Sequence, residues 1–173
     1  RAGVLLEDSF TYPDGDIAAN SGGKWVRHSP TSGTITAAEV ISGTLALSAT
    51  HNADVNSALS ATITTGTLYA SFSARFISAS STAEYFAHFQ SGTTNFRGRV
   101  FGRQSAPGKV RVGIASGGTT PVEVIPDLDM GTTHVVVVRY TLATGAARVW
   151  VDPTSEADAT GATASDTITI ASI

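Results

Sequence analysis

Cysteine is absent from this 173-residue chain, lysine occurs only at Lys24 and Lys109, and charged residues make up 14% of the sequence. The absence of cysteine excludes disulfides and thiolate metal sites. No stretch approaches the ~20 consecutive apolar residues of a membrane span. The net charge of −3 does not supply the basic surface that non-specific nucleic-acid binding needs. We therefore expect no nucleic-acid partner and no membrane span.

Hydrophobic residues make up 42% of the sequence, which is enough to drive the folding of a compact core. The length suits a single domain that covers residues 1–173. Ser, Thr, Ala and Gly dominate the remaining positions, a composition typical of secreted or assembled bacterial and viral proteins. We expect an extracellular, cell-surface or particle-surface location.

Short runs of β-branched and aromatic residues recur between clusters of Gly, Ser, Thr, Asn and Pro, and helical periodicity is nearly absent. This pattern predicts an all-β fold of the sandwich or barrel type. The predicted strands cover residues 4–10, 35–40, 44–47, 57–63, 68–77, 85–90, 97–102, 110–115, 121–125, 134–140, 147–151 and 167–170. The clearest hairpin joins residues 134–140 to 147–151, because Gly145 tolerates the positive φ of a tight connection.

Arginines alternate along residues 96–103. The predicted outward set is Arg97, Arg99, Phe101 and Arg103. Phe96 and Val100 fall on the opposite face, because successive side chains of a strand point to opposite sides. Arg111 of the following strand also points outward. One sheet is therefore predicted to display a polar, partly basic surface.

Tyr85 and His88, the two residues around the predicted strand 85–90 that could act as a base, fall on opposite faces when side chains alternate along residues 84–90. Tyr85 shares a predicted face with Ala87 and Phe89, whereas His88 shares the other face with Phe86. Tyr85 and His88 are therefore predicted to point in opposite directions.

Two stretches near opposite ends of the chain carry a family resemblance. The first reads E-D-S-F-T-Y-P-D-G-D over residues 7–16 and N-S-G-G-K-W over residues 20–25. The second reads G-T-T-H-V-V-V-V-R-Y over residues 131–140 and V-W-V-D-P over residues 149–153. They resemble the opening strand and the late hairpin of laminin G-like domains of bacterial surface and secreted proteins. The resemblance implies a two-sheet antiparallel jelly-roll sandwich of the concanavalin A-like class.

The end of the chain departs from that family. Such domains usually finish with one further strand beside the first, whereas this sequence stops at Ile173, soon after residues 167–170. A missing closing strand would leave the edge at residues 4–10 without a partner. Because unpaired strand edges invite pairing with another chain, a homo-oligomer or filament is one expected assembly.

The first functional hypothesis is a non-catalytic interaction domain that binds glycan or a neighbouring protein chain. Arginine clamps carboxylate or sulfate in bidentate geometry and stacks on sugar rings. Trp25, in a Gly-rich loop, is either a ligand contact or a structural plug. The candidate ligand-binding residues are Trp25, His88, Arg97, Arg99, Arg103 and Arg111.

Two alternatives remain open. One is a structural subunit of a filament, sheath or capsid decoration that assembles by strand-edge pairing. The other is a polysaccharide lyase acting on an acidic glycan, in which Arg neutralises a uronate and His or Tyr acts as base. Residues of the types a lyase needs are Tyr69, Arg75, His88, Gln90, Arg97 and Arg99. Glycoside hydrolysis is disfavoured, because the carboxylates are isolated rather than clustered along one strand.

Asp14 and Asp16 are the candidate metal ligands. They offer hard carboxylate oxygens within P-D-G-D, and calcium is frequent in related lectin-like folds. The competing interpretation is that Asp-Gly here only forms a turn. No cofactor is required by any motif in the sequence.

Overall fold

The computed structural model describes residues 3–173, of which 43% lie in strands and 2% in helix. The strands are β1 (Gly15–Asp16), β2 (Val26–Ser29), β3 (Glu39–Ile41), β4 (Thr44–Leu47), β5 (Asp54–Asn56), β6 (Thr67–Phe76), β7 (Glu84–Ser91), β8 (Asn95–Ala106), β9 (Lys109–Ala115), β10 (Val122–Glu123), β11 (Leu128–Asp129), β12 (Thr133–Thr141), β13 (Ala147–Val151) and β14 (Ala162–Thr163). One short helix, α1 (Ile17–Asn20), follows β1. The predicted all-β class is confirmed.

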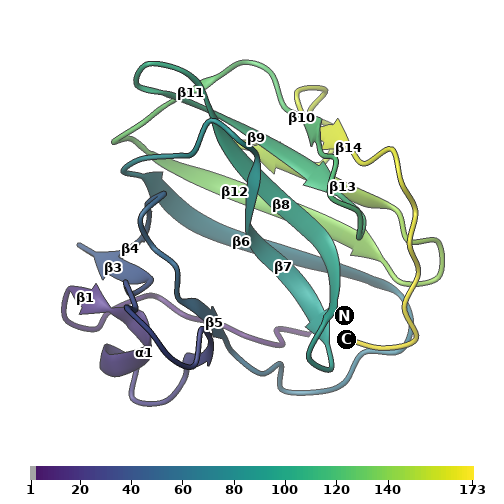
Figure 1. Cartoon of the computed structure of the whole chain (residues 1–173). Helices are drawn as coiled ribbons and strands as arrows, with labels where there is room; N and C mark the ends of the chain where they lie inside the picture. The colour runs from purple at the N-terminus through teal and green to yellow at the C-terminus, as the bar shows by residue number, and fades with distance from the viewer. Residues whose placement is uncertain (1–2) are drawn as a thin grey trace.

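Two larger sheets face each other in a sandwich-like arrangement (Figure 1). The seven-stranded sheet has the order β1-β3-β4-β6-β12-β13-β14, and all its pairings are antiparallel except that of β4 with β6. The five-stranded sheet runs β10-β9-β8-β7, with β11 also paired to β9. A separate ribbon consists of β2 and β5, and β5 lies on the same side of the molecule as α1 and β1 (Figure 1).

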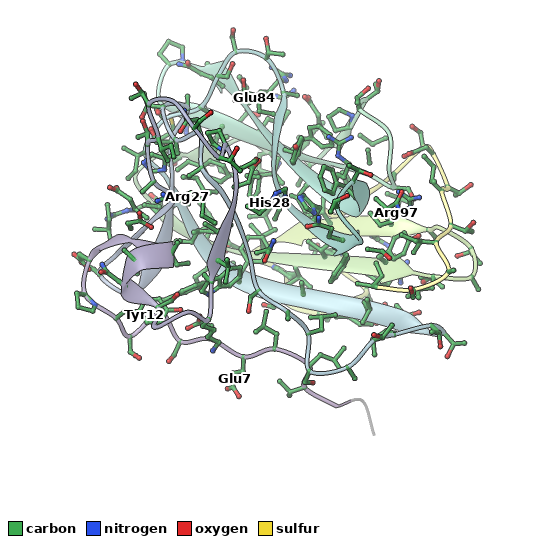
Figure 2. The ribbon with its side chains drawn as sticks, turned by 60° about the horizontal axis from the view of Figure 1, so that its bottom comes forward. Glu7, Tyr12, Arg27, His28, Glu84 and Arg97 are labelled. Atoms are coloured by element: carbon green, nitrogen blue, oxygen red, sulfur yellow. The ribbon has the colours of Figure 1, made fainter. Side chains whose placement is uncertain are left out.

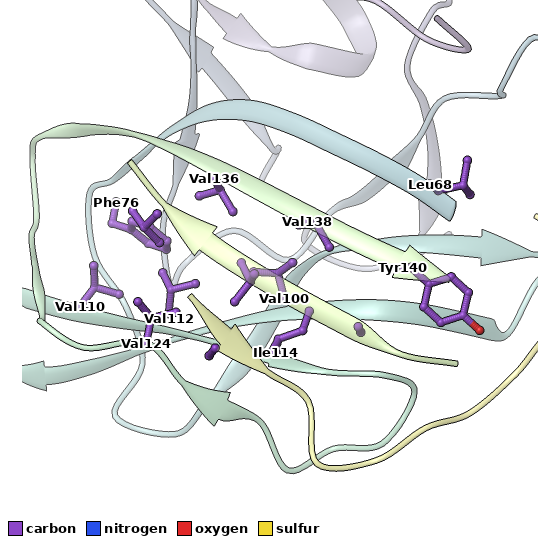
Figure 3. Packing of buried hydrophobic residues seen from close by; sticks show 14 of the residues in the cluster. Leu68, Phe76, Val100, Val110, Val112, Ile114, Val124, Val136, Val138 and Tyr140 are labelled. Atoms are coloured by element: carbon purple, nitrogen blue, oxygen red, sulfur yellow. The ribbon is translucent and has the colours of Figure 1, made fainter. Parts of the chain in front are cut away.

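The hydrophobic core fills the space between the two larger sheets (Figure 3). Val136 and Val138 of β12 point into it, against Val100 of β8 and Val112 of β9, and all four are at most 2% exposed. Because only every second residue of a strand faces the core, the alternate positions form the outer faces of the sandwich. These outer faces carry the candidate sites.

The strands predicted between residues 68 and 151 are the best confirmed. The predicted strand 147–151 coincides with β13, and residues 68–77 and 134–140 match β6 and β12 within one residue at either end. The β12–β13 hairpin also turns as predicted, since Gly145 has a φ of +67°.

Three predicted strands, at residues 4–10, 57–63 and 167–170, are wrong. The first is interrupted at Phe10, whose φ of +50° is left-handed and whose backbone N–H donates to the Asp8 carboxylate. The carbonyls of the last are taken by side chains, because Thr169 O accepts from Arg97 and Ile168 O accepts from Tyr140. The short strand β14 lies instead within residues 152–166, where the sequence predicts no strand.

The backbone around residues 57–63 brings the first and last described segments together. Ser60 N donates to Leu5 O at 2.9 Å, and Ile63 exchanges two hydrogen bonds with Ile173 at 2.8 and 2.9 Å. Residues 4–10 themselves form no strand. The predicted pairing of an edge strand at these residues with another chain therefore has no strand on which to build.

Candidate functional site

The outer face of the five-stranded sheet holds most of the predicted ligand-binding residues. Cross-strand pairing of Phe101 with Gly113 and of Arg103 with Arg111 places these residues side by side on β8 and β9. Arg99 lies on the same face, with its guanidinium carbon 5.3 Å from the centre of the Phe101 ring. The predicted outward orientation of Arg99, Phe101, Arg103 and Arg111 is confirmed.

Arg97 does not share that face, because a β-bulge at Gly98 reverses the alternation of β8. Between two successive pairs with β7, strand β8 has one residue more than its partner, and Gly98 adopts a φ of +56°. One extra residue moves the side chains before it to the other face. Arg97 instead donates to Thr169 O at 3.2 Å, beside the C-terminal segment in Figure 2. Phe96, predicted to face inward with Val100, points outward.

A second irregularity in β7 corrects the prediction that Tyr85 and His88 point in opposite directions. The pairing shifts register between Tyr85 and Ala87 and again between Ala87 and Phe89. Phe86 and Phe89 consequently both pack against the core. The rings of Tyr85 and His88 lie on one side of the strand, with centroids 5.6 Å apart.

These two bulges assemble a compact surface that we call the Arg99 platform, formed by Tyr85, His88, Phe96 and Arg99. The imidazole of His88 stacks on Phe96 with centroids 4.2 Å apart. The Arg99 guanidinium lies 4.3 Å from the centre of the Tyr85 ring and 5.9 Å from that of Phe96. All four side chains are half-buried, so each keeps a part in contact with solvent. Cation–π contacts of this kind fix the guanidinium over the rings.

The polar atoms of the Arg99 platform are only partly satisfied within the described residues. Arg99 Nη1 donates to Gly118 O at 2.9 Å, while its buried Nε has no hydrogen-bond partner there. Burial lowers the pKa of His88, and the positive charge of Arg99 adds to that effect. The lowered pKa favours the neutral imidazole, in which one ring nitrogen accepts a hydrogen bond.

The opposite end of the same face, which we call the carboxylate end, consists of Arg103, Arg111, Glu123 and Asp127. Glu123 accepts two hydrogen bonds from Arg103, at 2.5 and 2.9 Å, and Asp127 accepts one from Arg111 at 2.5 Å. The bond from Arg103 holds the pKa of Glu123 below its usual range. The positive charges of Arg103 and Arg111 are thus neutralised by the protein itself.

Trp25 belongs to a different region, where the first family-like segment folds on itself. Its indole N–H donates to Asp8 at 2.6 Å, and its ring stacks on Phe10 with centroids 6.3 Å apart. The Tyr12 hydroxyl donates to the same carboxylate, so burial and this bond raise the pKa of Tyr12 to about 12. Trp25 is thereby held in a local cluster, beside a cavity of about 410 Å³ lined by residues 7–9, 11, 12 and 24. Whether it also contacts a ligand stays a prediction.

Asp14 and Asp16 do not converge on a common point. Asp14 accepts from Ser42 N at 2.7 Å, whereas Asp16 caps α1 through Ala18 N at 2.8 Å and pairs with Arg27 at 2.6 Å. Within residues 3–173 no three or more His, Cys, Asp or Glu side chains form a group that could hold a metal ion. Asp14 thus binds the backbone at Ser42 and Asp16 acts as an N-cap, and a calcium site stays a prediction.

The residues predicted for a lyase are divided between the two sheets. Tyr69 and Arg75 lie on β6, in the seven-stranded sheet, whereas His88 and Arg99 lie on the five-stranded sheet. Gln90 donates to Gly92 O within its own turn. On the five-stranded sheet, Tyr85, His88 and Arg99 bring two candidate bases next to a basic side chain.

Phe96 is a functional candidate that sequence analysis missed, and Tyr85 is a candidate base that it placed on the wrong face. An isolated glycine inside a strand is typical of a bulge, so Gly98 is the signal that indicates the position of Phe96.

Among the described residues no helix is long and apolar enough to cross a membrane. Comparison of the chain with protein-family models, curated proteins and solved structures gave no match. The laminin G-like resemblance therefore stays a prediction.

Proposed function

We propose that this chain is a non-catalytic interaction domain that binds an acidic glycan through the Arg99 platform. The sandwich serves as a rigid support, and its finer architecture would be a concanavalin A-like jelly roll in an extracellular or particle-surface setting. The observation that carries the proposal is the placement of Tyr85, His88, Phe96 and Arg99 on one half-buried surface by two bulges. Bulges that re-aim side chains are over-represented next to functional sites.

The chemistry of the Arg99 platform fits a uronate or sulfated sugar better than an uncharged one. Arg99 has no carboxylate partner among the ion pairs of the described residues, in contrast to Arg103 and Arg111. Its guanidinium is already oriented by the Tyr85 ring, so less conformational entropy is lost when an anion binds. The rings supply apolar faces on which a sugar can stack, and neutral His88 supplies a polar edge.

Affinity electrophoresis in gels containing alginate, pectate or chondroitin sulfate tests the proposal. The wild-type chain should be retarded, and Arg99→Gln should weaken binding about tenfold or more, because a hydrogen bond to a charged group contributes ~1.5–3 kcal/mol. Arg103→Gln is the matched control, since it removes the same charge from the same face but from an arginine that Glu123 already neutralises. Equal losses in both variants, or no retardation of wild type, would contradict the proposal.

One observation favours a second candidate, a polysaccharide lyase. Tyr85 and His88 lie on the same side of β7 as Arg99, so a base and a carboxylate-neutralising group face a common space. In this reaction Tyr85 or His88 takes the proton next to the uronate carboxylate, a C=C bond forms as the bond to the leaving sugar oxygen breaks, and the protonated side chain or water gives a proton to that oxygen. The unsaturated uronate product absorbs in the ultraviolet, because its C=C bond is conjugated with the carboxylate. Constant absorbance with alginate, pectate and glycosaminoglycans would exclude the lyase and leave the binding proposal intact.

A further inference from the structure

A second candidate site lies on the outer face of the seven-stranded sheet. We call it the Tyr69 groove, a cavity of about 240 Å³ lined by Tyr69, Val137, Trp150 and residues 153–156. Val137 pairs with Trp150 across β12 and β13, and both alternate with the core residues Val136, Val138 and Val149. The groove therefore opens on the side of the sandwich opposite the Arg99 platform.

Tyr69 is the exposed wall of the groove, and its ring is held in place. Its side chain is 53% exposed, yet its hydroxyl donates to Glu156 Oε1 at 2.8 Å. Arg139 Nη1 donates to the same oxygen at 2.7 Å. An exposed aromatic ring that is already fixed loses little conformational entropy when a ligand stacks on it.

The floor of the groove is apolar and is built on a buried tryptophan. Trp150 is 1% exposed, because Arg139, Arg148 and the chain around Gly161 cover it. A Cβ at residue 161 would lie 2.4 Å from Trp150 Cδ1, so the close approach of the loop to this ring depends on glycine. Together with Val137, the edge of this ring gives the groove a dry base next to the polar residues 154–156.

The charges in the groove cancel, while hydrogen-bonding groups remain open. Glu156 and Arg139 form an ion pair at 2.7 Å, so neither a cation nor an anion meets a net opposite charge there. The hydroxyls of Thr154 and Ser155 and the second carboxylate oxygen of Glu156 have no hydrogen-bond partner among residues 3–173. A ligand that fits must combine an apolar face with several hydroxyls and carry no charge.

We propose that the Tyr69 groove binds an uncharged sugar ring, stacked by its apolar face on Tyr69 and hydrogen-bonded to Glu156, Thr154 and Ser155. Its volume lies below the ~300 Å³ at which drug-sized pockets begin, so it accommodates a single ring at a time. The proposal is independent of acidic-glycan binding at the Arg99 platform, because the two surfaces share no residue.

Ligand-observed NMR saturation transfer with neutral gluco-, xylo-, manno- and galacto-oligosaccharides tests this site. At least one series should give saturation transfer to ring protons with wild type. Tyr69→Ala should reduce the affinity about tenfold or more, whereas Tyr69→Phe, which keeps the ring but releases it from Glu156, should reduce it less. Both variants are expected to fold, since substitutions of exposed residues rarely change stability much.

Tyr85→Ala is the matched control, because it removes a tyrosine from the Arg99 platform on the other face. It should leave neutral-sugar binding unchanged. The proposal is overturned if wild type gives no saturation transfer with any series, or if Tyr69→Ala and Tyr85→Ala weaken binding equally. Neither result changes the conclusion from affinity electrophoresis with acidic polysaccharides, which tests the Arg99 platform separately.

Discussion

The two ends of one sheet face, both built on β8 and β9, treat the same residue type in opposite ways. At the carboxylate end, Arg103 and Arg111 are paired with Glu123 and Asp127. At the Arg99 platform, Arg99 is surrounded by aromatic rings and by backbone carbonyls. A guanidinium beside a carboxylate has lost most of its attraction for an external anion, whereas one stacked on rings keeps its charge. The difference between the ends therefore lies in their neighbours rather than in the number of arginines.

Among the predicted effects, the largest is expected from removal of the Phe101 ring, which lies next to Arg99 and supports the Arg99 platform. Phe101 is only 3% exposed although it lies on the outer face, and it contacts Tyr85 with centroids 6.1 Å apart. Phe101→Ala should lower the free energy of unfolding by about 3–5 kcal/mol, as for a core phenylalanine. Chemical denaturation measures this loss. Arg103→Gln, two residues along the same strand, should shift the midpoint far less, and equal shifts would show that Phe101 is not packed as described.

Gly98→Ala should have the next largest effect, because it strains the bulge that creates the Arg99 platform. Alanine at a φ of +56° costs about 1–2 kcal/mol, and its Cβ would lie 3.3 Å from the Phe89 ring. Stability and retardation by acidic polysaccharides should both fall. Gly92→Ala is the matched control, since Gly92 has a φ of +62° in the β7–β8 turn but no atom within 4 Å of its Cβ. Gly92→Ala should lose stability and still bind acidic polysaccharides. Loss of binding in both variants would show that binding does not depend specifically on the bulge at Gly98.

The two ends should also respond to acid in different pH ranges. Burial lowers the pKa of His88 in the folded state below its usual 6.5, so the folded chain binds fewer protons than the unfolded chain. The corresponding stability is present above pH 6.5 and is lost as the pH falls from 6.5 through the folded pKa. NMR titration of the imidazole and denaturation at several pH values measure this, and His88→Gln should remove the slope. A His88 pKa at or above 6.5 would contradict the described burial.

At the carboxylate end the stability change belongs to lower pH and should be the smallest of these effects. The hydrogen bond from Arg103 lowers the pKa of Glu123 below 4.5, so its contribution is present above that pH and is lost as the pH falls through the folded pKa. The pair is partly exposed to solvent, which screens it. Glu123→Gln should lower the free energy of unfolding by a roughly constant small amount above pH 4.5 and flatten the loss of stability below that pH. A variant that keeps the wild-type slope below pH 4.5 would contradict this assignment.

Sequence alternation was sufficient to predict the outward face of β8 from Arg99 onward, because that part of the strand is regular. It failed for Arg97 and Phe96, since one extra residue at Gly98 exchanges the faces before it. It failed for Tyr85 and His88 for the same physical reason. Which arginines are neutralised could not be predicted, because Glu123 and Asp127 reach Arg103 and Arg111 from 12 to 20 residues away along the chain.

Strand prediction from composition fails in the irregular N-terminal part of the chain. Residues 4–10 and 57–63 have strand-like composition. At residues 4–10, however, local hydrogen bonds such as that from Phe10 N to the Asp8 carboxylate compete with the regular hydrogen bonds of a sheet. The same motif that suggested a family, with Asp8, Phe10, Tyr12 and Trp25, forms one cluster in space. The association of these residues in one cluster could not be predicted, because it depends on a contact between Asp8 and Trp25, 17 positions apart in the sequence.

Chemical-shift mapping with an acidic oligosaccharide tests the central claim most directly. In a series of heteronuclear NMR spectra, amide and side-chain signals of Tyr85, His88, Phe96 and Arg99 should shift in a saturable way, while those of Arg103 and Arg111 stay within noise. Shifts that centre on Arg103 and Arg111, or that spread over every arginine and disappear with modest salt, would contradict selective binding at the Arg99 platform.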